Sequence, residues 1–441
     1  MTKDQILESA RQQGVDFINL QFADILGLVK AVTIPVSKLD EAIDHNVWFD
    51  GSSIEGFTRI FESDMFLKLD LETFAILPWQ KNTARLICDV YLPDGQPFPG
   101  DPRQVLKLQL AEAKKLGYIY NVGPELEFFL FNKSDHGKIA AWPHDTAGYF
   151  DLSTDLAQAI RQEMTEALRG LNIDVETLHH EVAAGQHEID FKYADALVTA
   201  DRAVTFRYAL KAIAQKHNLH VTFMPKPIEG INGSGMHVHQ SLFDASSRNN
   251  AFFDASGKFH LSELALNFIA GQLKHAPGFA AVTNPLVNSY KRLVPGYEAP
   301  VYVAWGQTNR SALIRIPSFT AGREKAVRCE LRCPDPAANP YLAFAVMLAS
   351  GLDGIKSKLA PPESIEENIF KFSDEQAKQH NVGNLPENLR AAVQLLGQDE
   401  VVKNALGPHV YENFVAAKTA EWDSYKTFVS GWEQKKYLEI Y

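Results

Sequence analysis

Gly123-Pro-Glu-Leu-Glu-Phe-Phe-Leu-Phe131 predicts a strand that carries two carboxylates directly beside an apolar run. Side chains two positions apart on a strand point to the same face, so Glu125 and Glu127 project together. The apolar run predicts that this strand is buried. Two buried like charges need a cation, because one of them otherwise takes up a proton. A solvated strand edge explains this single pair equally well.

Three further clusters of polar residues lie on other predicted strands. They are His179-His-Glu-Val-Ala-Ala-Gly-Gln-His-Glu-Ile-Asp190, Asn232-Gly-Ser-Gly-Met-His-Val-His-Gln-Ser241 and Arg328-Cys-Glu-Leu-Arg-Cys333. In the second cluster, two histidines and a serine share one strand face, and two glycines let the backbone approach a ligand closely. In the third, an Arg, a Glu and an Arg share one face, and two cysteines share the opposite face.

Together these clusters supply six side chains that suit a divalent cation. They are Glu125, Glu127, Glu181, Glu188, His237 and Glu330. A lone histidine on a strand is more often structural, but four clusters of one kind indicate a common site. Carboxylates with a single imidazole are ligands for Mg²⁺ or Mn²⁺ and are poor ligands for zinc. Six ligands suit two or three ions better than one.

A second group of residues is cationic. It comprises Arg292, Arg310, Arg315, Lys325, Arg328 and Arg332. Solvated surface arginines are the alternative interpretation. Divalent ions beside several arginines are what phosphoryl transfer requires, because both stabilise the charge on the transferred group. The sequence has neither a Gly-x-x-x-x-Gly-Lys-Ser/Thr loop nor a strand-to-helix Gly-x-Gly-x-x-Gly, so a nucleotide would be held outside the two commonest frameworks.

Composition excludes some classes of protein. The chain of 441 residues has 43 Lys+Arg against 54 Asp+Glu, a formal charge of −11, which does not favour a general nucleic-acid binder. Three cysteines cannot form a disulfide framework and indicate a reducing cytoplasm. The start of the chain is polar, and the longest uncharged stretch, 336–352, falls short of a membrane span. We therefore expect a soluble cytoplasmic protein without membrane contact.

The segment 93–102 is dense in turn-forming residues and predicts a domain boundary. Before it, we expect short strands over 16–36, turning at Leu26-Gly27, and a β-rich run over 74–91. After it, Asp101 and Pro102 begin a helix that stops at Gly117. Strands are then expected over 120–131, about 172–191, about 219–243 and 325–333. Helices are expected over about 154–169, about 200–217, 262–276 and from Asn339. The expected fold class is α+β, with a small β-rich N-terminal domain and a large α+β domain.

The chain resembles glutamine synthetase of the bacterial type I, in the shorter form that is not adenylylated (I-alpha-like). Eight motifs in family order carry the resemblance. They are Phe49-Asp-Gly-Ser-Ser-Ile-Glu-Gly-Phe57, Glu62-Ser-Asp-Met65, Gly123-Pro-Glu-Leu-Glu-Phe128, His180-Glu-Val-Ala-Ala-Gly-Gln-His-Glu188, Asn232-Gly-Ser-Gly-Met-His237, Asn288-Ser-Tyr-Lys-Arg-Leu-Val-Pro-Gly-Tyr-Glu-Ala-Pro300, Asn309-Arg-Ser311 and Asp335-Pro-Ala-Ala-Asn-Pro-Tyr-Leu342. The resemblance implies a β-grasp-like N-terminal domain over 14–98. It also implies a catalytic domain over 103–441 of the glutamine synthetase/guanido kinase type.

The resemblance also implies an activity, the ATP-dependent joining of ammonia to glutamate through a γ-glutamyl phosphate. One metal would be held by Glu127, Glu181 and Glu188, and the other by Glu125, His237 and Glu330. Glutamate would contact Asn232, Gly233, Arg292 and Arg332. ATP would contact Glu176, the backbone near Phe191, His239, Ser241, Arg315 and Lys325. Lys325 belongs to a segment, 316–327, that is longer than the family pattern.

The remaining roles concern catalysis and the ammonium ion. Arg310 would stabilise the transferring phosphoryl group, and Glu298 would be the flap over the intermediate. Asp50 and Ser53 would form the ammonium site with Tyr149 and Glu181. Because Asp50 would come from a neighbouring subunit, the resemblance implies a dodecamer of two hexameric rings.

Regulation and two rival functions complete the expectations. The region 380–395 has no tyrosine, so adenylylation is not expected. Inhibition by glutamine through Arg59 is the better hypothesis, with a plain surface arginine as its alternative. A nitrogen-responsive transcription repressor is a candidate partner. One rival is a ligase that uses another amine, and the other is a non-enzymatic descendant of the family.

Overall fold

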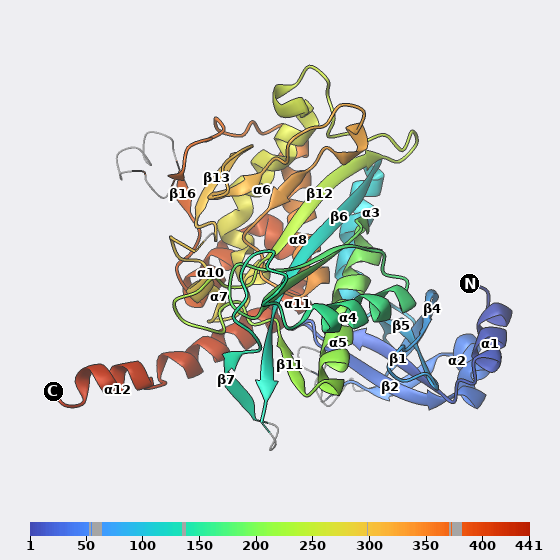
Figure 1. Cartoon of the computed structure of the whole chain (residues 1–441). Helices are drawn as coiled ribbons and strands as arrows, with labels where there is room; N and C mark the ends of the chain where they lie inside the picture. The colour runs from blue at the N-terminus through green and yellow to red at the C-terminus, as the bar shows by residue number, and fades with distance from the viewer. Residues whose placement is uncertain (53, 55–63, 135–137, 298, 370–371, 373–381) are drawn as a thin grey trace.

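The computed structural model describes residues 1–52, 54, 64–134, 138–297, 299–369, 372 and 382–441. The N-terminal part forms a five-stranded sheet in the order β2-β1-β5-β4-β3 (Figure 1). Its strands are β1 (Phe17–Ala23), β2 (Val29–Pro35), β3 (Val47–Asp50), β4 (Asp64–Ile76) and β5 (Thr83–Tyr91). The β1–β5 pair is parallel and the other pairs are antiparallel. The predicted turn at Leu26-Gly27 is confirmed, because it joins β1 to β2.

Two helices pack with this sheet. They are α1 (Lys3–Gln12) and α2 (Leu39–His45), the second preceded by the short η1 (Val36–Lys38). Thr2 and Gln5 form a reciprocal capping box at the start of α1, which satisfies free backbone N–H groups there. Ile6 and Ala10 of α1 belong to the same apolar core as the sheet. The predicted β-rich run over 74–91 is wrong in its bounds. The structure has β4 and β5 with a turn between them, and β4 begins at Asp64.

A second, eleven-stranded sheet is built around one long strand, β6 (Tyr118–Lys133). The path of this sheet is β16-β13-β14-β15-β12-β6-β9-β8, and β7, β10 and β11 also pair with β6. The remaining strands are β7 (Ile139–Pro143), β8 (Val175–His180), β9 (Gln186–Phe191), β10 (Ala194–Asp195), β11 (Leu219–Thr222), β12 (Met236–Asp244), β13 (Tyr302–Gly306), β14 (Ala312–Arg315), β15 (Cys329–Leu331) and β16 (Gly383–Asn384). The single strand predicted over about 172–191 is therefore wrong, because that run forms the pair β8 and β9. The strands predicted over about 219–243 are β11 and β12.

The part of the chain after β5 also forms a set of helices (Figure 1). They are α3 (Pro102–Lys115), α4 (Gln158–Gly170), α5 (Ala196–Lys216), α6 (Glu263–Thr283), α7 (Ser289–Arg292), α8 (Pro340–Lys356), α10 (Leu389–Gln398), α11 (Glu400–Lys426) and α12 (Gly431–Tyr437), with η3 (Lys258–His260) and η4 (Glu324–Ala326). Asp101 caps α3, as predicted, and Asn339, from which a helix was expected, caps α8. A Cβ on Gly271 of α6 would lie 2.2 Å from the Ser350 carbonyl oxygen of α8, so glycine permits the close crossing of these helices.

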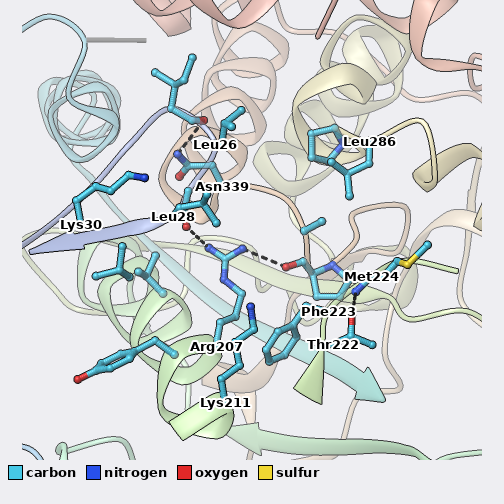
Figure 2. A pocket seen from close by; sticks show the side chains of 18 of the residues that line it. Leu26, Leu28, Lys30, Arg207, Lys211, Thr222, Phe223, Met224, Leu286 and Asn339 are labelled. Carbon is cyan, nitrogen blue, oxygen red and sulfur yellow. Dashed lines mark hydrogen bonds between the residues drawn. The ribbon is translucent and has the colours of Figure 1, made fainter. Parts of the chain in front are cut away.

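Several polar contacts join the N-terminal sheet to the rest of the chain, and Arg207 makes one of them. The Arg207 guanidinium of α5 donates to the carbonyls of Gly27, Pro336 and Ala338 at 2.9–3.1 Å. Figure 2 shows it between the β1–β2 turn and the segment before α8. Gly27 has a φ of +77°, and a Cβ there would meet the Asn339 Cα at 2.9 Å. The turn is therefore fixed against α5 and the start of α8.

Within the described residues, no helix is both long and apolar enough to cross a membrane. The α12 helix extends away from the body of the molecule at the C-terminal end (Figure 1). All three cysteines are buried and free.

Candidate active site

Strand register brings the predicted metal ligands together at the centre of the large sheet. In the β12–β6 pair, His237 lies opposite Glu125, and in the β6–β9 pair, Glu127 lies opposite Glu188. In the β12–β15 pair, His239 lies opposite Glu330. The sequence places each acid on a strand face by its period of two. Register then sets these faces side by side.

Glu125, His237 and Glu330 form the first ligand group. Their ligand atoms lie within 4.8 Å of one another. The Nδ1 atom of His237 is 3.5 Å from Glu125 and 3.9 Å from Glu330. Burial lowers the pKa of His237 to about 4, and Arg332 acts in the same direction. The imidazole is therefore neutral at pH 7, which is the form that binds a metal.

His239 orients this group without belonging to it. Its Nε2 atom lies 2.7 Å from Glu125, while its Nδ1 atom accepts from the Arg328 Nε at 3.1 Å. Because Nδ1 accepts, Nε2 carries the proton and donates to Glu125. Burial acts to raise the pKa of Glu125, but bonds from His237 and His239 outweigh it and lower that pKa. Glu125 is therefore ionised.

Glu127 belongs to the second predicted ligand group, together with Glu181 and Glu188. Its carboxylate accepts from the Gln186 side chain at 2.7 Å and from the Gly235 backbone N–H at 3.0 Å. Burial, followed by the charge of Glu181, raises the pKa of Glu127 to about 8. Burial and neighbouring acids, Asp190 first, also raise the pKa of Glu188 well above its usual range. Without a bound cation, burying these carboxylates in their charged form costs free energy, and a divalent ion would offset that cost.

Arginines surround the same place. Glu330 is fully buried and accepts from Arg315 at 2.5 Å and from Arg332. Arg292 donates to the carbonyls of Cys333, at 2.7 Å, and of Arg332, at 3.2 Å. A cavity of about 40 Å³ lies between these arginines and the acids. It is lined by Glu127, Glu181, Gln186, Asn232, Gly233, His237, Arg292, Tyr297, Ala299 and Arg332. The predicted glutamate residues therefore meet the predicted ligands of both metals.

A larger cavity of about 450 Å³ opens beside Glu125. Five of the predicted ATP contacts line it, namely Glu176, Phe191, His239, Ser241 and Lys325. The sixth, Arg315, is not among its lining residues within the described chain and pairs with Glu330 instead.

The structure does not bring every predicted residue into these cavities. Asp50 lies at the end of the edge strand β3 and lines neither of them, and its carboxylate accepts from the Ser52 backbone N–H at 2.8 Å. Tyr149 is half exposed, stacks on Phe150 with ring centroids 3.9 Å apart, and meets the edge of His179. Arg310 is exposed before β14. Ser53, Arg59 and Glu298 lie outside the described residues.

Two sets of residues behind the site were missed by sequence reasoning. Gln186 joins Glu127 to the Gly233 carbonyl, which it reaches at 3.1 Å, although its motif gave no sign of this. Asp145, His180 and His187 form a buried group with ligand atoms within 4.8 Å. Arg161 lies 2.8 Å from His187 Nδ1. That nitrogen must therefore accept, so Nε2 carries a proton, and this tautomer together with the adjacent cation disfavours a metal there. Asp145 lies outside every motif.

Comparison with known proteins assigns the chain to a family. The glutamine synthetase β-Grasp domain matches residues 14–93, and the glutamine synthetase catalytic domain matches residues 99–437. The chain belongs to the glutamine synthetase family. It is 56% identical over 444 residues to a glutamine synthetase of Clostridium saccharobutylicum, covering 100% of this chain and 99% of that one. It is 54% identical over 449 residues to a glutamine synthetase of Thermus thermophilus, with the same coverage.

Solved structures agree with this assignment. A structure described as a GmaS/ADP complex superposes with a TM-score of 0.90 at 34% identity, over 99% of each chain. A ligand-free GmaS gives a TM-score of 0.88 at 35% identity, over 98% of this chain and 99% of that one. The expected fold, a β-grasp N-terminal domain with a large catalytic domain, is confirmed.

The glutamine synthetase assignment also confirms the predicted activity. The chain is a glutamate–ammonia ligase that forms glutamine with ATP. Its substrates are glutamate, ammonia and ATP, and the family uses divalent metals. The acid and histidine groups described above are suited to hold such ions.

Proposed function

We propose that the six carboxylate and imidazole side chains at the centre of the large sheet hold two divalent cations, Mg²⁺ or Mn²⁺, with room for a third beside ATP. Glu127, Glu181 and Glu188 hold one, and Glu125, His237 and Glu330 hold the other. The observation that carries this proposal is strand register, which sets Glu127 opposite Glu188 and His237 opposite Glu125. The ligand atoms of Glu125, His237 and Glu330 lie within 4.8 Å of one another. When bound, the cations neutralise the phosphate oxygens and the departing ADP.

Glutamate occupies the cavity beside Glu127 in this proposal. Asn232 and Gly233 bind it on one loop, and Arg292 and Arg332 supply positive charge. Both arginines are buried and held by hydrogen bonds, so they are oriented before the substrate arrives. The site therefore favours a small dicarboxylate.

ATP occupies the larger cavity beside Glu125. Its proposed contacts are Glu176, the backbone near Phe191, His239, Ser241, Arg315 and Lys325. The cavity of about 450 Å³ suits a nucleotide, and its end at Glu125 lies toward the metal ligands. That a GmaS of similar fold was solved with ADP supports a nucleotide site in this fold.

The reaction then takes two steps. A γ-carboxylate oxygen of glutamate attacks the γ-phosphorus of ATP, and the bond to the ADP oxygen breaks. Arg310 stabilises the charge on the transferring group. Ammonium, held by Asp50 of a neighbouring copy with Ser53, Tyr149 and Glu181, gives up a proton to the Asp50 carboxylate. Ammonia then attacks the acyl carbon, the bond to phosphate breaks, and the departing phosphate takes the second proton from the nitrogen. Glu298 shields the water-labile intermediate.

Assembly and regulation extend this proposal. Asp50 lies on an edge strand outside the cavities of its own chain, which supports a site shared between copies. We propose a dodecamer of two hexameric rings, in the cytoplasm, where three free thiols stay reduced. Arg59 would mediate inhibition by glutamine, and the inhibited form would contact a nitrogen-responsive transcription repressor.

Steady-state assays test the site. Purified protein with Mg²⁺, ATP, glutamate and ammonium should release phosphate and form glutamine in equal amounts. Turnover on a panel of larger amines should be much lower, and a preference for one of them would contradict the ammonium site. Glutamine should inhibit the wild type more strongly than Arg59→Ala, and equal inhibition would refute the role of Arg59.

A further inference from the structure

The loop 225–235, which carries two of the proposed glutamate contacts, is folded around the side chain of Lys226. This lysine is only 8% exposed, and its Nζ atom donates to the Ile231 carbonyl. A Cβ on Gly233 would lie 2.3 Å from the Pro225 carbonyl oxygen and 3.3 Å from the Lys226 Cδ atom. The loop therefore closes tightly on the lysine stem.

Lys226 also binds the segment that carries Arg292. Its backbone N–H donates to the Asn288 side chain at 2.7 Å, and that amide donates back to the Lys226 carbonyl at 3.0 Å. Asn288 directly precedes α7, which ends at Arg292. The Nζ atom of Lys226 lies 3.8 Å from the ring centroid of Tyr297, a cation–π geometry. One residue thus contacts the glutamate loop, the start of α7 and the tyrosine beyond it.

Tyr297 in turn lines the cavity of about 40 Å³ together with Asn232, Gly233 and Arg292. Lys226 is not among the residues of the described chain that line it. We propose that Lys226 is a positioning residue for glutamate, whose ammonium group holds the Tyr297 ring and the loop 225–235 in the arrangement that receives the substrate. This inference rests on the proposed glutamate site.

Charge supports the same role. Burial, followed by the charge of Arg292, lowers the pKa of Lys226. A glutamate carboxylate bound at Arg292 would offset that positive charge, and the lysine would then hold Tyr297 more strongly. A methionine at 226 would fill a similar volume, but it would leave the Ile231 carbonyl without this donor and the ring without its cation.

A double-mutant cycle between Lys226 and Tyr297 tests the inference on the full chain. The variants are Lys226→Met, Tyr297→Leu and their combination, with Tyr297→Phe and Lys226→Arg as conservative forms. Each single change should raise KM for glutamate about tenfold. The double variant should match Lys226→Met, because Tyr297→Leu then removes only a contact that is already lost. Tyr297→Phe keeps the ring and Lys226→Arg keeps the cation, so both should stay within about threefold of wild type. KM for ATP should change less than about twofold throughout, since the ATP cavity is separate.

Lys211→Met is the control, because the Lys211 ammonium group also lies over an aromatic ring, 5.9 Å from the Phe223 centroid, outside the site. It should leave KM for glutamate unchanged. Additive effects in the double variant, or an equal rise in KM for ATP, would overturn the inference. If Lys226→Met fails to fold, equal KM values for Tyr297→Leu and Tyr297→Phe would overturn it. An inactive wild type would instead count against the proposed function.

Discussion

Two cavities of this protein differ in size and in the state of the charged groups around them. The cavity between the N-terminal sheet and α5 measures about 860 Å³ (Figure 2). Its walls include Leu26, Leu28 and Phe223, and its Arg207 is satisfied by three backbone carbonyls. The cavity beside Glu127 measures only about 40 Å³.

The smaller cavity nevertheless holds the chemistry. Burial raises the pKa values of Glu127 and Glu188. Glu127 accepts hydrogen bonds from Gln186 and from the Gly235 backbone N–H, but these do not outweigh the effect of burial on its pKa. In the larger cavity, the Arg207 guanidinium instead joins the β1–β2 turn to the segment before α8. Buried acids with raised pKa values, rather than a large volume, therefore mark the site built for a ligand.

Glu127→Gln should have the largest effect. The change keeps the volume but removes a charge from the proposed metal site, so we expect kcat for phosphate release to fall by about 10³-fold. The melting temperature without metal should stay the same or rise, because a buried acid with a raised pKa is replaced by a neutral amide. Thermal unfolding and a phosphate assay measure both. Glu163→Gln on α4 is the control, and retention of activity by Glu127→Gln would contradict the metal assignment.

Arg207→Met tests whether the polar contacts at the larger cavity serve stability alone. It leaves three carbonyls without their donor, so the free energy of unfolding should fall by about 2 kcal/mol. The KM values of the folded enzyme should change less than about twofold, because these bonds lie outside the proposed site. Arg11→Met, at an exposed ion pair with Glu8, should change neither quantity. A large rise in one KM at unchanged stability would show that the larger cavity is functional.

Magnesium binding should depend on pH. Glu127 has a pKa of about 8 without metal and must lose its proton to bind a cation. Affinity should therefore fall as the pH drops below 8, with at least about one proton released per site near pH 7, because Glu188, whose pKa is also raised, adds to the proton from Glu127. Calorimetry in two buffers of different ionisation enthalpy counts that proton. Saturating Mg²⁺, at about 100 times its Kd, should add about 2.7 kcal/mol of stability. Affinity that is constant between pH 6 and 8 would contradict the role of Glu127.

The smallest effect concerns the thiols. Burial raises the pKa of Cys329 and of Cys333 to about 12 each, so neither forms a reactive thiolate at neutral pH. Cys88 is buried as well. A thiol reagent should label none of the three in the folded protein and all three in denaturant. Rapid labelling of Cys329 in the native state would show that the apolar face of β15 becomes exposed to solvent.

Much of this site was predictable because strand periodicity is local. Glu125 and Glu127, or His237 and His239, share a face wherever the strand lies, and family motifs then assign roles to these residues. The bounds of β4 and β5 were less predictable, because a continuous β-rich run does not reveal the turn inside it. Asp145 and Gln186 were missed since their partners are distant in sequence.

The family, the activity and the acid-rich strands follow from residue identity and a period of two, which can be read along the chain. The pairing of strands that sets His237 opposite Glu125 follows from the folded chain alone. So do the burial of Glu127, which raises its pKa, and the contact of Lys226 with Tyr297. Burial and register arise from contacts between residues far apart in the chain, and local patterns do not encode them.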